Sequence, residues 1–207
     1  MPSYHPPFLT STTYHIYNHA NGDDNIFRDQ DNYRFFLEKY VKYINPVADT
    51  FAYCLMRNHF HLMVRIKDEE YFQNYEPFKG FKPLKGLDFE EGISKYISLQ
   101  FSHFFNGYTQ AINKMYKRRS SLFNPRVKRK QIINNNYYTG LIIYIHNNPV
   151  HHGFVEDIGD WSHSSYPDIL EESDSIVETE KVLEWFGNKN AFVETHKNTT
   201  GLKSVFD

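Results

Sequence analysis

The chain has 207 residues, a length that suits one sizeable hydrophobic core with at most a small appendage. Its 40% hydrophobic and 23% charged residues exclude a fibre or a disordered chain and predict an ordinary folded domain. The formal net charge of -2, taken as an average over the chain, argues against a protein that coats nucleic acid.

The cysteine count and the hydrophobic runs bear on the compartment. Cys54 is the single cysteine, so an intramolecular disulfide and a cysteine-rich zinc site are both excluded. The start of the chain lacks the apolar stretch of a secretory signal, and aliphatic runs such as 141–145 are too short to span a bilayer. We therefore expect a cytoplasmic protein with no membrane partner.

Hydrophobic periodicity predicts the elements of the first half of the chain. Alternation predicts a strand over 14–18, and helical spacing predicts an amphipathic helix over 31–44 that stops before Pro46. Two strand-like runs, 51–56 and 59–67, flank the dipeptide Arg57-Asn58, which suits a tight hairpin.

The second half begins with residues 68–91, which show no clean period and are interpreted as a long insertion loop. Helical spacing returns over 93–115, with a possible kink at Asn106-Gly107. The remaining predicted elements are a broken strand over 121–133, a helix over 137–148 halted by Pro149, and a short helix over 179–186 in an acidic tail.

This order of elements predicts an α+β fold in which an antiparallel sheet carries helices on one face, as in ferredoxin-like or RRM-like proteins. We expect one main domain over residues 1–167, which includes the insertion loop, and an acidic C-terminal extension over 168–207.

Two histidines stand out on the predicted strand 59–67. Because side chains alternate along a strand, His59 and His61 share one face, and Phe60, Leu62 and Val64 form the apolar one. Two imidazoles at i and i+2 are within reach of one divalent cation. The same pair also fits solvated or hydrogen-bonded strand histidines, so a metal site requires a third ligand.

The predicted helix 137–148 offers that ligand. Leu141, Ile142 and Ile145 belong to its buried stripe, whereas Tyr144 lies off the stripe with Asn148 four residues later on nearly the same side. A tyrosine in such a place is most often a half-buried packing group. Together with a metal held by two histidines and an amide, it suits phosphodiester transesterification, in which the phenolate attacks phosphorus and forms a covalent phosphotyrosine.

These residues match a known family. Residues 58–64, Asn58-His59-Phe60-His61-Leu62-Met63-Val64, resemble the HUH motif, and residues 144–153 are similar to the catalytic helix of REP-associated tyrosine transposases, which are single-tyrosine HUH transposases of the insertion-sequence type. The similarity continues in the same order through shorter segments at 14–18, 100–102, 108–113, 121–123, 128–130, 161–162 and 164–166.

The resemblance implies an enzyme that cuts and rejoins single-stranded DNA with Mg²⁺ or Mn²⁺ through a 5′-phosphotyrosine intermediate. By position, Tyr144 is the implied nucleophile, His59 and His61 are implied metal ligands, and Asn148 is the third ligand. Single-stranded or hairpin DNA is then the expected partner, for a monomer or a homodimer. Many relatives outside this branch carry Gln where this chain has Asn148.

The near-neutral charge hides a local excess of cations. Residues 92–155 contain no Asp or Glu, and basic side chains interleaved with aromatic ones suit a groove that follows a phosphate backbone and stacks unpaired bases. A solvated helix end and loop is the alternative reading. The candidate DNA-binding residues are Lys114, Lys117, Arg118, Arg119, Arg126, Lys128, Arg129 and Lys130.

Three functions therefore follow from the sequence. The first is a metal-dependent single-strand DNA endonuclease and strand transferase of the transposase type acting on hairpin DNA. The second is a non-catalytic module that binds single-stranded or hairpin nucleic acid. The third is an HUH nuclease that initiates replication or mobilisation, which shares the covalent chemistry and differs in its DNA site.

Overall fold

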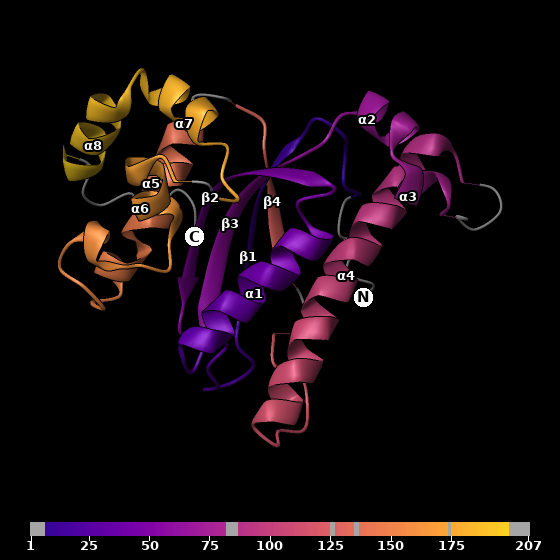
Figure 1. Cartoon of the computed structure of the whole chain (residues 1–207), viewed down its shortest axis with the longest axis horizontal. Coiled ribbons are helices and arrows are strands. Elements are labelled where there is room, and N and C mark those ends of the chain that lie inside the picture. The colour runs from indigo at the N-terminus through magenta and orange to yellow at the C-terminus, as the bar shows by residue number, and fades with distance from the viewer. Residues whose placement is uncertain (1–6, 82–86, 125–126, 135–136, 174, 199–207) are drawn as a thin grey trace.

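The computed structural model describes residues 7–81, 87–124, 127–134, 137–173 and 175–198. Its centre is a four-stranded antiparallel sheet in the order β2-β3-β1-β4 (Figure 1). The strands are β1 (Thr13–His19), β2 (Ala48–Met56), β3 (His59–Ile66) and β4 (Lys128–Ile132). With a helix in each crossover, this is the strand order of the ferredoxin-like class and confirms the predicted α+β fold.

The two crossover helices, α1 (Gln30–Tyr43) and α4 (Phe89–Met115), cover one face of the sheet (Figure 1). Asp29 caps α1 by accepting from the backbone N–H of Asn32, and a capping box begins α4. Phe36 of α1 packs against Phe60 of β3 at 5.5 Å, so the predicted apolar face of the strand is the core face. Helix α4 is continuous through the predicted kink.

The segment predicted as an insertion loop has secondary structure. It contains the short helices α2 (Glu69–Asn74) and α3 (Glu76–Lys79), and α4 already begins at Phe89. Asp68 caps α2. The apolar side chains of these helices are too few to show a period, but Phe72 and Phe78 are buried and pack together with ring centroids 5.7 Å apart. Residues 82–86 lie outside the described part of the chain.

Helix α5 (Tyr138–His151) lies against the opposite face of the sheet, over β2 and β3. The sequence predicted that Pro149 would end this helix, and that prediction was wrong, because Pro149 lies inside its last turn. Proline lacks one N–H donor, but the later N–H groups still find carbonyls: that of His152 donates to Asn148 and that of Phe154 to Pro149. The helix thereby keeps Asn148 in regular helical geometry.

The C-terminal region adds the 3₁₀ helix η2 (Ile158–Asp160) and helices α6 (Ser165–Glu171), α7 (Thr179–Phe186) and α8 (Lys189–Asn198). Helix α7 has the predicted bounds. These helices pack on α5 and β2, and Val182 and Phe192 are completely buried there. The acidic extension therefore supports the catalytic-helix candidate from its outer side.

A buried hydrogen-bond chain joins these elements. Nδ1 of His196 lies 2.7 Å from the carbonyl oxygen of Phe192, so it carries the proton, and Nε2 accepts from Nδ1 of His146 at 2.9 Å. Nε2 of His146 then accepts from the hydroxyl of Ser165 at 2.8 Å, and that oxygen accepts from the backbone N–H of Tyr53 at 2.9 Å. Both histidines are therefore neutral, and this buried histidine chain ties α5 to α6, α8 and β2.

Among the described residues, no helix combines the length and the apolar character that crossing a membrane requires.

Candidate active site

His59 and His61 lie at the start of β3, immediately after the Arg57-Asn58 turn. As predicted, they face away from the core under α1 and α4. They are not on an open face, because α5 covers them and leaves His59 2% and His61 5% exposed. The antiparallel register places Tyr17 of β1 opposite His61 and His19 opposite His59 on the same face.

Tyr144 and Asn148 of α5 meet the histidines across this interface. The ring of Tyr144 is edge-on to His61, with centroids 5.5 Å apart and planes at 89°. Asn148 donates from Nδ2 to the carbonyl oxygen of Tyr144 at 2.8 Å. The four predicted site residues are thus brought together from two elements. They share a cavity of about 360 Å³ that is also lined by Tyr17, His19, Lys128, His151 and His152.

The hydrogen bonds around the histidines decide which ring nitrogens can act as ligands. Nδ1 of His59 lies 2.8 Å from Oδ1 of Asn58, an acceptor, so Nδ1 carries the proton and the lone pair is on Nε2. Nε2 of His59 is buried and forms no hydrogen bond with any described residue. Nδ1 of His61 lies 2.9 Å from Nε2 of His15, and the tautomer protonated on Nδ1 leaves Nε2 of His61 for coordination.

Both candidate ligands are held in the neutral form. Burial, together with the nearby His19 and His152, lowers the pKa of His59 to about 3, although the Asn148 side chain partly opposes the shift. Burial also lowers the pKa of His61 well below its ordinary value, with His15 and His59 adding to the effect. Neutral imidazole is the form that binds a metal ion.

The residues present fit a divalent cation. An orphaned imidazole nitrogen, a second imidazole and an amide oxygen form a mixed N and O donor set of the kind that suits Mn²⁺, with Asn148 presenting Oδ1 because its Nδ2 is engaged. Within the described chain, no three His, Cys, Asp or Glu side chains converge on a metal position. A metal held by these residues would have to take its remaining ligands from water or from a substrate phosphate.

The fold also brings to the site histidines that are absent from the candidate set defined by the sequence. His19 stacks on His59 at 4.7 Å, and His152 meets the same ring at 4.7 Å and 61°. His15 stacks on His61 at 5.2 Å. The alternation of β1, with His15 and Tyr17 on one side, is the signal that finds His15 and His19 once the pairing of β1 with β3 is known. His146 does not line the cavity and belongs to the buried histidine chain.

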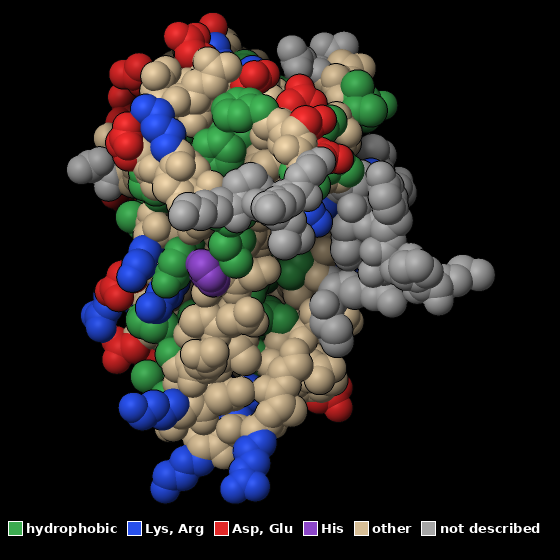
Figure 2. Space-filling model, turned by 90° about the vertical axis from the view of Figure 1, so that its right-hand side faces the viewer, with side chains coloured by type: hydrophobic (Ala, Val, Ile, Leu, Met, Phe, Trp, Pro, Cys, Tyr) green, Lys and Arg blue, Asp and Glu red, His purple; other side chains and the backbone are tan. Residues whose placement is uncertain are grey.

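The candidate DNA-binding cations divide among several places. Lys128 lines the cavity, and Lys130 follows on the same strand face, opposite His15. Arg129 faces the other side of the sheet, with its guanidinium 4.0 Å from the ring centre of Phe8. Three exposed cations, Lys114, Lys117 and Arg119, lie at the end of α4, where Figure 2 shows basic side chains projecting from the lower end of the molecule. Arg126 lies outside the described residues.

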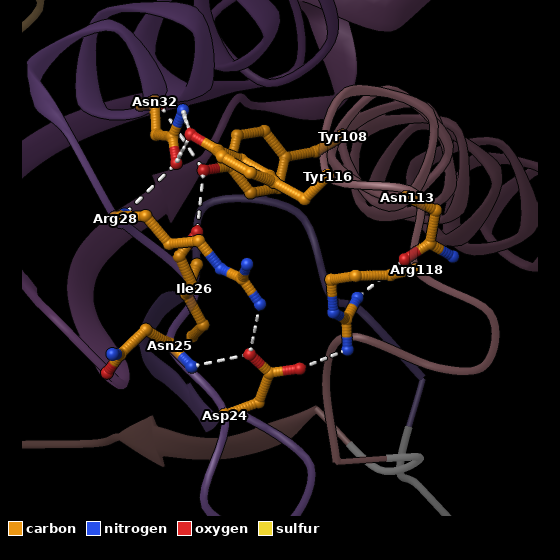
Figure 3. Close-up of polar contacts among 9 residues, drawn as sticks. All are labelled: Asp24, Asn25, Ile26, Arg28, Asn32, Tyr108, Asn113, Tyr116 and Arg118. Carbon is orange, nitrogen blue, oxygen red and sulfur yellow. Dashed lines mark hydrogen bonds and ion pairs between the residues drawn. The ribbon is translucent and has the colours of Figure 1, made fainter.

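Arg118 differs from its neighbours because its guanidinium is engaged inside the protein. It pairs with Asp24 and donates to Asn113, and its side chain is 13% exposed (Figure 3). Asp24 also binds Arg28 at 2.9 Å. Asn32 donates from Nδ2 to the hydroxyl of Tyr116 at 3.0 Å. This Arg118 network anchors the loop between β1 and α1 to the end of α4, at the same end of the sheet as His19 and His59.

Comparison with known proteins supports the fold. The chain is similar to a solved REP-associated tyrosine transposase bound to a REP hairpin, with a TM-score of 0.54 and 19% identity over 85% of this chain and 90% of that chain. At this identity the similarity shows a shared fold, and the functional residues require their own argument. No family model and no curated protein matches the sequence.

Proposed function

We propose that this protein is a metal-dependent enzyme that cleaves and rejoins single-stranded hairpin DNA, with Tyr144 as nucleophile. One observation carries the proposal: the Tyr144 ring contacts His61 in a cavity shared with His59 and Asn148, although α5 is about eighty residues from β3 in sequence. A hydroxyl, two neutral imidazoles and an amide oxygen are the groups that metal-assisted phosphoryl transfer requires.

In the proposed reaction the Tyr144 phenol loses its proton and its oxygen bonds to the scissile phosphorus. The bond from phosphorus to the 3′ oxygen breaks, and that oxygen takes up a proton. The products are a 5′-phosphotyrosine and a free 3′-hydroxyl, and the reverse reaction with another 3′-hydroxyl rejoins a strand. His59, His61 and Asn148 would hold Mg²⁺ or Mn²⁺, which supplies positive charge to the phosphate when bound.

Other residues of the chain position the substrate. Lys128 lines the cavity and is suited to pair with a phosphate next to the scissile one. His15 supports the ring of His61, and Asn58 supports that of His59, so both imidazoles are oriented before metal binds. The exposed cations at the end of α4 are suited to contact the backbone of a longer DNA.

The test is formation of a covalent adduct. Full-length protein is incubated with single-stranded hairpin oligonucleotides taken from imperfect palindromes that flank its gene, with Mg²⁺ or Mn²⁺, and separated on a denaturing gel. We expect an adduct that Tyr144→Phe and EDTA abolish. Tyr137→Phe, an exposed tyrosine next to the start of α5, is the matched control and should leave the adduct unchanged. An adduct that persists in Tyr144→Phe would reject the assignment.

A second candidate is a non-catalytic module that binds hairpin or single-stranded nucleic acid. It is favoured by the burial of Tyr144, which is only 4% exposed. This candidate expects salt-sensitive binding that is unaffected by EDTA and by the double change His59→Ala and His61→Ala, with no adduct. The same gel and a binding titration therefore separate the two.

A further inference from the structure

A second hollow lies beside the turn that carries the site histidines. It has a volume of about 480 Å³, and its walls include Tyr33, Arg57, Phe154, Asp160, Trp161 and His163. We call it the Arg57 hollow. Its lining comes from α1 and the residues just before it, from the β2–β3 turn and from the segment between α5 and α6, so the folded chain is needed to form it.

One wall of the hollow is a stack of parallel rings. Phe27 and Tyr33 lie 4.4 Å apart with planes at 12°, and Tyr33 and His163 lie 3.6 Å apart at 3°. Phe27 and Tyr33 are buried, whereas His163 is only half-buried and is the outermost ring of the stack. A flat ring that enters the hollow can extend this stack.

A second aromatic wall stands at right angles to the first. Trp161 donates from its ring nitrogen to the carbonyl of Leu55 at 3.2 Å, which fixes the indole against β2. Its plane is 86° from that of His163. Phe154 contacts Trp161 at 5.5 Å between ring centroids and is 40% exposed, so part of its ring faces solvent. The two walls form a corner that matches a planar ligand.

The hollow also holds opposite charges that do not pair with each other. Within the described residues, the side chains of Arg57 and Asp160 form no hydrogen bond or ion pair. Asp29, the other carboxylate of the hollow, is already engaged by Tyr116 and by the cap of α1. Among the described residues that line it, the hollow thus offers the guanidinium of Arg57 and the carboxylate of Asp160 to a ligand with both an acidic group and a donor.

The β2–β3 turn connects the hollow to the proposed active site, although the two cavities share no lining residue. Arg57 belongs to the hollow, and the next residue, Asn58, binds Nδ1 of His59. The carbonyl of Arg57 accepts from the backbone N–H of Phe27, and that of Asn58 accepts from Ala20, so the turn is fixed from both sides. Arg57 is thus two residues along the chain from His59, which favours a nucleotide next to a phosphate held at the histidines as the ligand of the hollow.

We propose that the Arg57 hollow binds one unpaired nucleotide next to the scissile phosphate, an inference that rests on the function proposed above. The base stacks on His163 beside Trp161, and its phosphate pairs with Arg57. Asp160 accepts a hydrogen bond from an exocyclic amino group, which adenine and cytosine carry and thymine lacks. The hollow thereby favours bases with an amino group at this position of a single strand.

Tryptophan fluorescence tests the hollow without cleavage. The chain has two tryptophans, and the Trp185→Phe protein keeps only Trp161 in the hollow. On a Tyr144→Phe background in EDTA, we expect the oligonucleotides dA10 and dC10 to quench Trp161 and dT10 to bind roughly tenfold more weakly. The Trp161→Phe protein, in which Trp185 on α7 is the remaining reporter, should show no quenching.

Side-chain variants assign the roles. Arg57→Ala should weaken dA10 binding roughly tenfold, and Asp160→Ala should remove the difference between dA10 and dT10. Arg34→Ala and Asp31→Asn make similar charge changes on the exposed face of α1, where both side chains are 71% exposed, and should change neither property. Binding of dA10 by Arg57→Ala equal to that by Arg34→Ala would overturn the proposal, as would unchanged Trp161 fluorescence.

The two proposals fail separately. If the wild-type protein forms the Tyr144 adduct but the hollow variants bind and cleave like their controls, the hollow proposal is wrong and the active site stands. If dA10 quenches Trp161 in an Arg57-dependent way but no adduct forms on any hairpin, the hollow is supported as a single-strand DNA site and the catalytic proposal is wrong.

Discussion

The ring of Tyr144 meets that of His61 edge-on within one chain, with centroids 5.5 Å apart. Helix α5 is packed on β2 and β3 of its own sheet and is held from outside by α7 and α8. The nucleophile candidate therefore belongs to the same site as the histidines of its own subunit, and no exchange of α5 between subunits is needed to complete the site.

This arrangement predicts catalysis in cis. A Tyr144→Phe protein mixed with a protein carrying His59→Ala and His61→Ala should form no adduct, because neither subunit has a complete site. The measurement is the denaturing-gel adduct assay at several mixing ratios, with wild-type protein diluted into either variant as the control. Recovery of adduct in the mixture of the two variants would mean that Tyr144 acts in a partner subunit.

Because Asn58 binds His59, replacing Asn58 should change the Mn²⁺ requirement of the protein indirectly. Removing the acceptor with Asn58→Ala frees the His59 ring to rotate and to change tautomer, which should raise the Mn²⁺ concentration for half-maximal adduct formation by roughly 10- to 100-fold. Asn58→Asp keeps an acceptor and should stay near wild type. Asn190→Ala, on the exposed start of α8, is the neutral control. Equal Mn²⁺ dependence in Asn58→Ala and wild type would contradict this role.

The local elements and the identity of the site residues follow from the sequence because they depend on short-range patterns. Alternation in 59–67 is enough to put His59 and His61 on one face, and helical spacing separates Tyr144 from Leu141 and Ile142. The burial of Tyr144 could not be predicted, since it depends on α5 being enclosed by the sheet on one side and by α7 and α8 on the other.

Long-range contacts also explain the other differences between the sequence-based predictions and the structure. Arg118 looks like its exposed neighbours until the loop carrying Asp24 is placed beside the end of α4. The second half of the C-terminal extension has little apolar period, yet Phe192 and His196 are buried because α5 offers them a matching surface. Patterns of a few residues contain no information on such partners.

The buried histidine chain predicts that the hydroxyl of Ser165 contributes strongly to the stability of the fold. Ser165→Ala removes the donor to Nε2 of His146 and the acceptor for the N–H of Tyr53, which leaves both groups buried and unsatisfied. We expect the free energy of unfolding to fall by roughly 1–3 kcal/mol, measured by urea denaturation. Ser162→Ala, on an exposed side chain of the same segment, should change it by less than about 0.5 kcal/mol. Equal stability of the two variants would contradict a complete chain.

His196 predicts how stability depends on pH. Burial lowers its pKa to about 4, so between the ordinary pKa of about 6.5 and that value the unfolded chain binds more protons than the folded one. Stability from this group is fully present above pH 6.5 and is lost as pH falls toward 4, by roughly 3 kcal/mol in total. His146 faces the same ring and stays neutral with it.

Urea denaturation at several pH values between 4 and 7 measures this effect. His196→Gln is less stable at pH 7 because it loses the contact with His146, but it has one titrating group fewer. The decline of its unfolding free energy toward acid pH should therefore be shallower than that of wild type. Parallel curves for the two proteins would show that His196 does not titrate in this window.

Lys128 and Arg118 are close in sequence, but replacing them should have different effects: loss of Lys128 should weaken DNA binding, and loss of Arg118 should lower stability. Lys128 lines the cavity, so Lys128→Ala should weaken binding of single-stranded DNA about equally for all sequences and reduce the slope of log K against log salt by about 1. Arg118 is paired with Asp24, so Arg118→Ala should leave the salt slope unchanged and lower the free energy of unfolding by roughly 1–2 kcal/mol.

Anisotropy titrations at several salt concentrations, combined with urea denaturation, measure both quantities. A salt slope reduced by Arg118→Ala and unaffected by Lys128→Ala would reverse these assignments and place the DNA contact at the end of α4 instead of at the cavity.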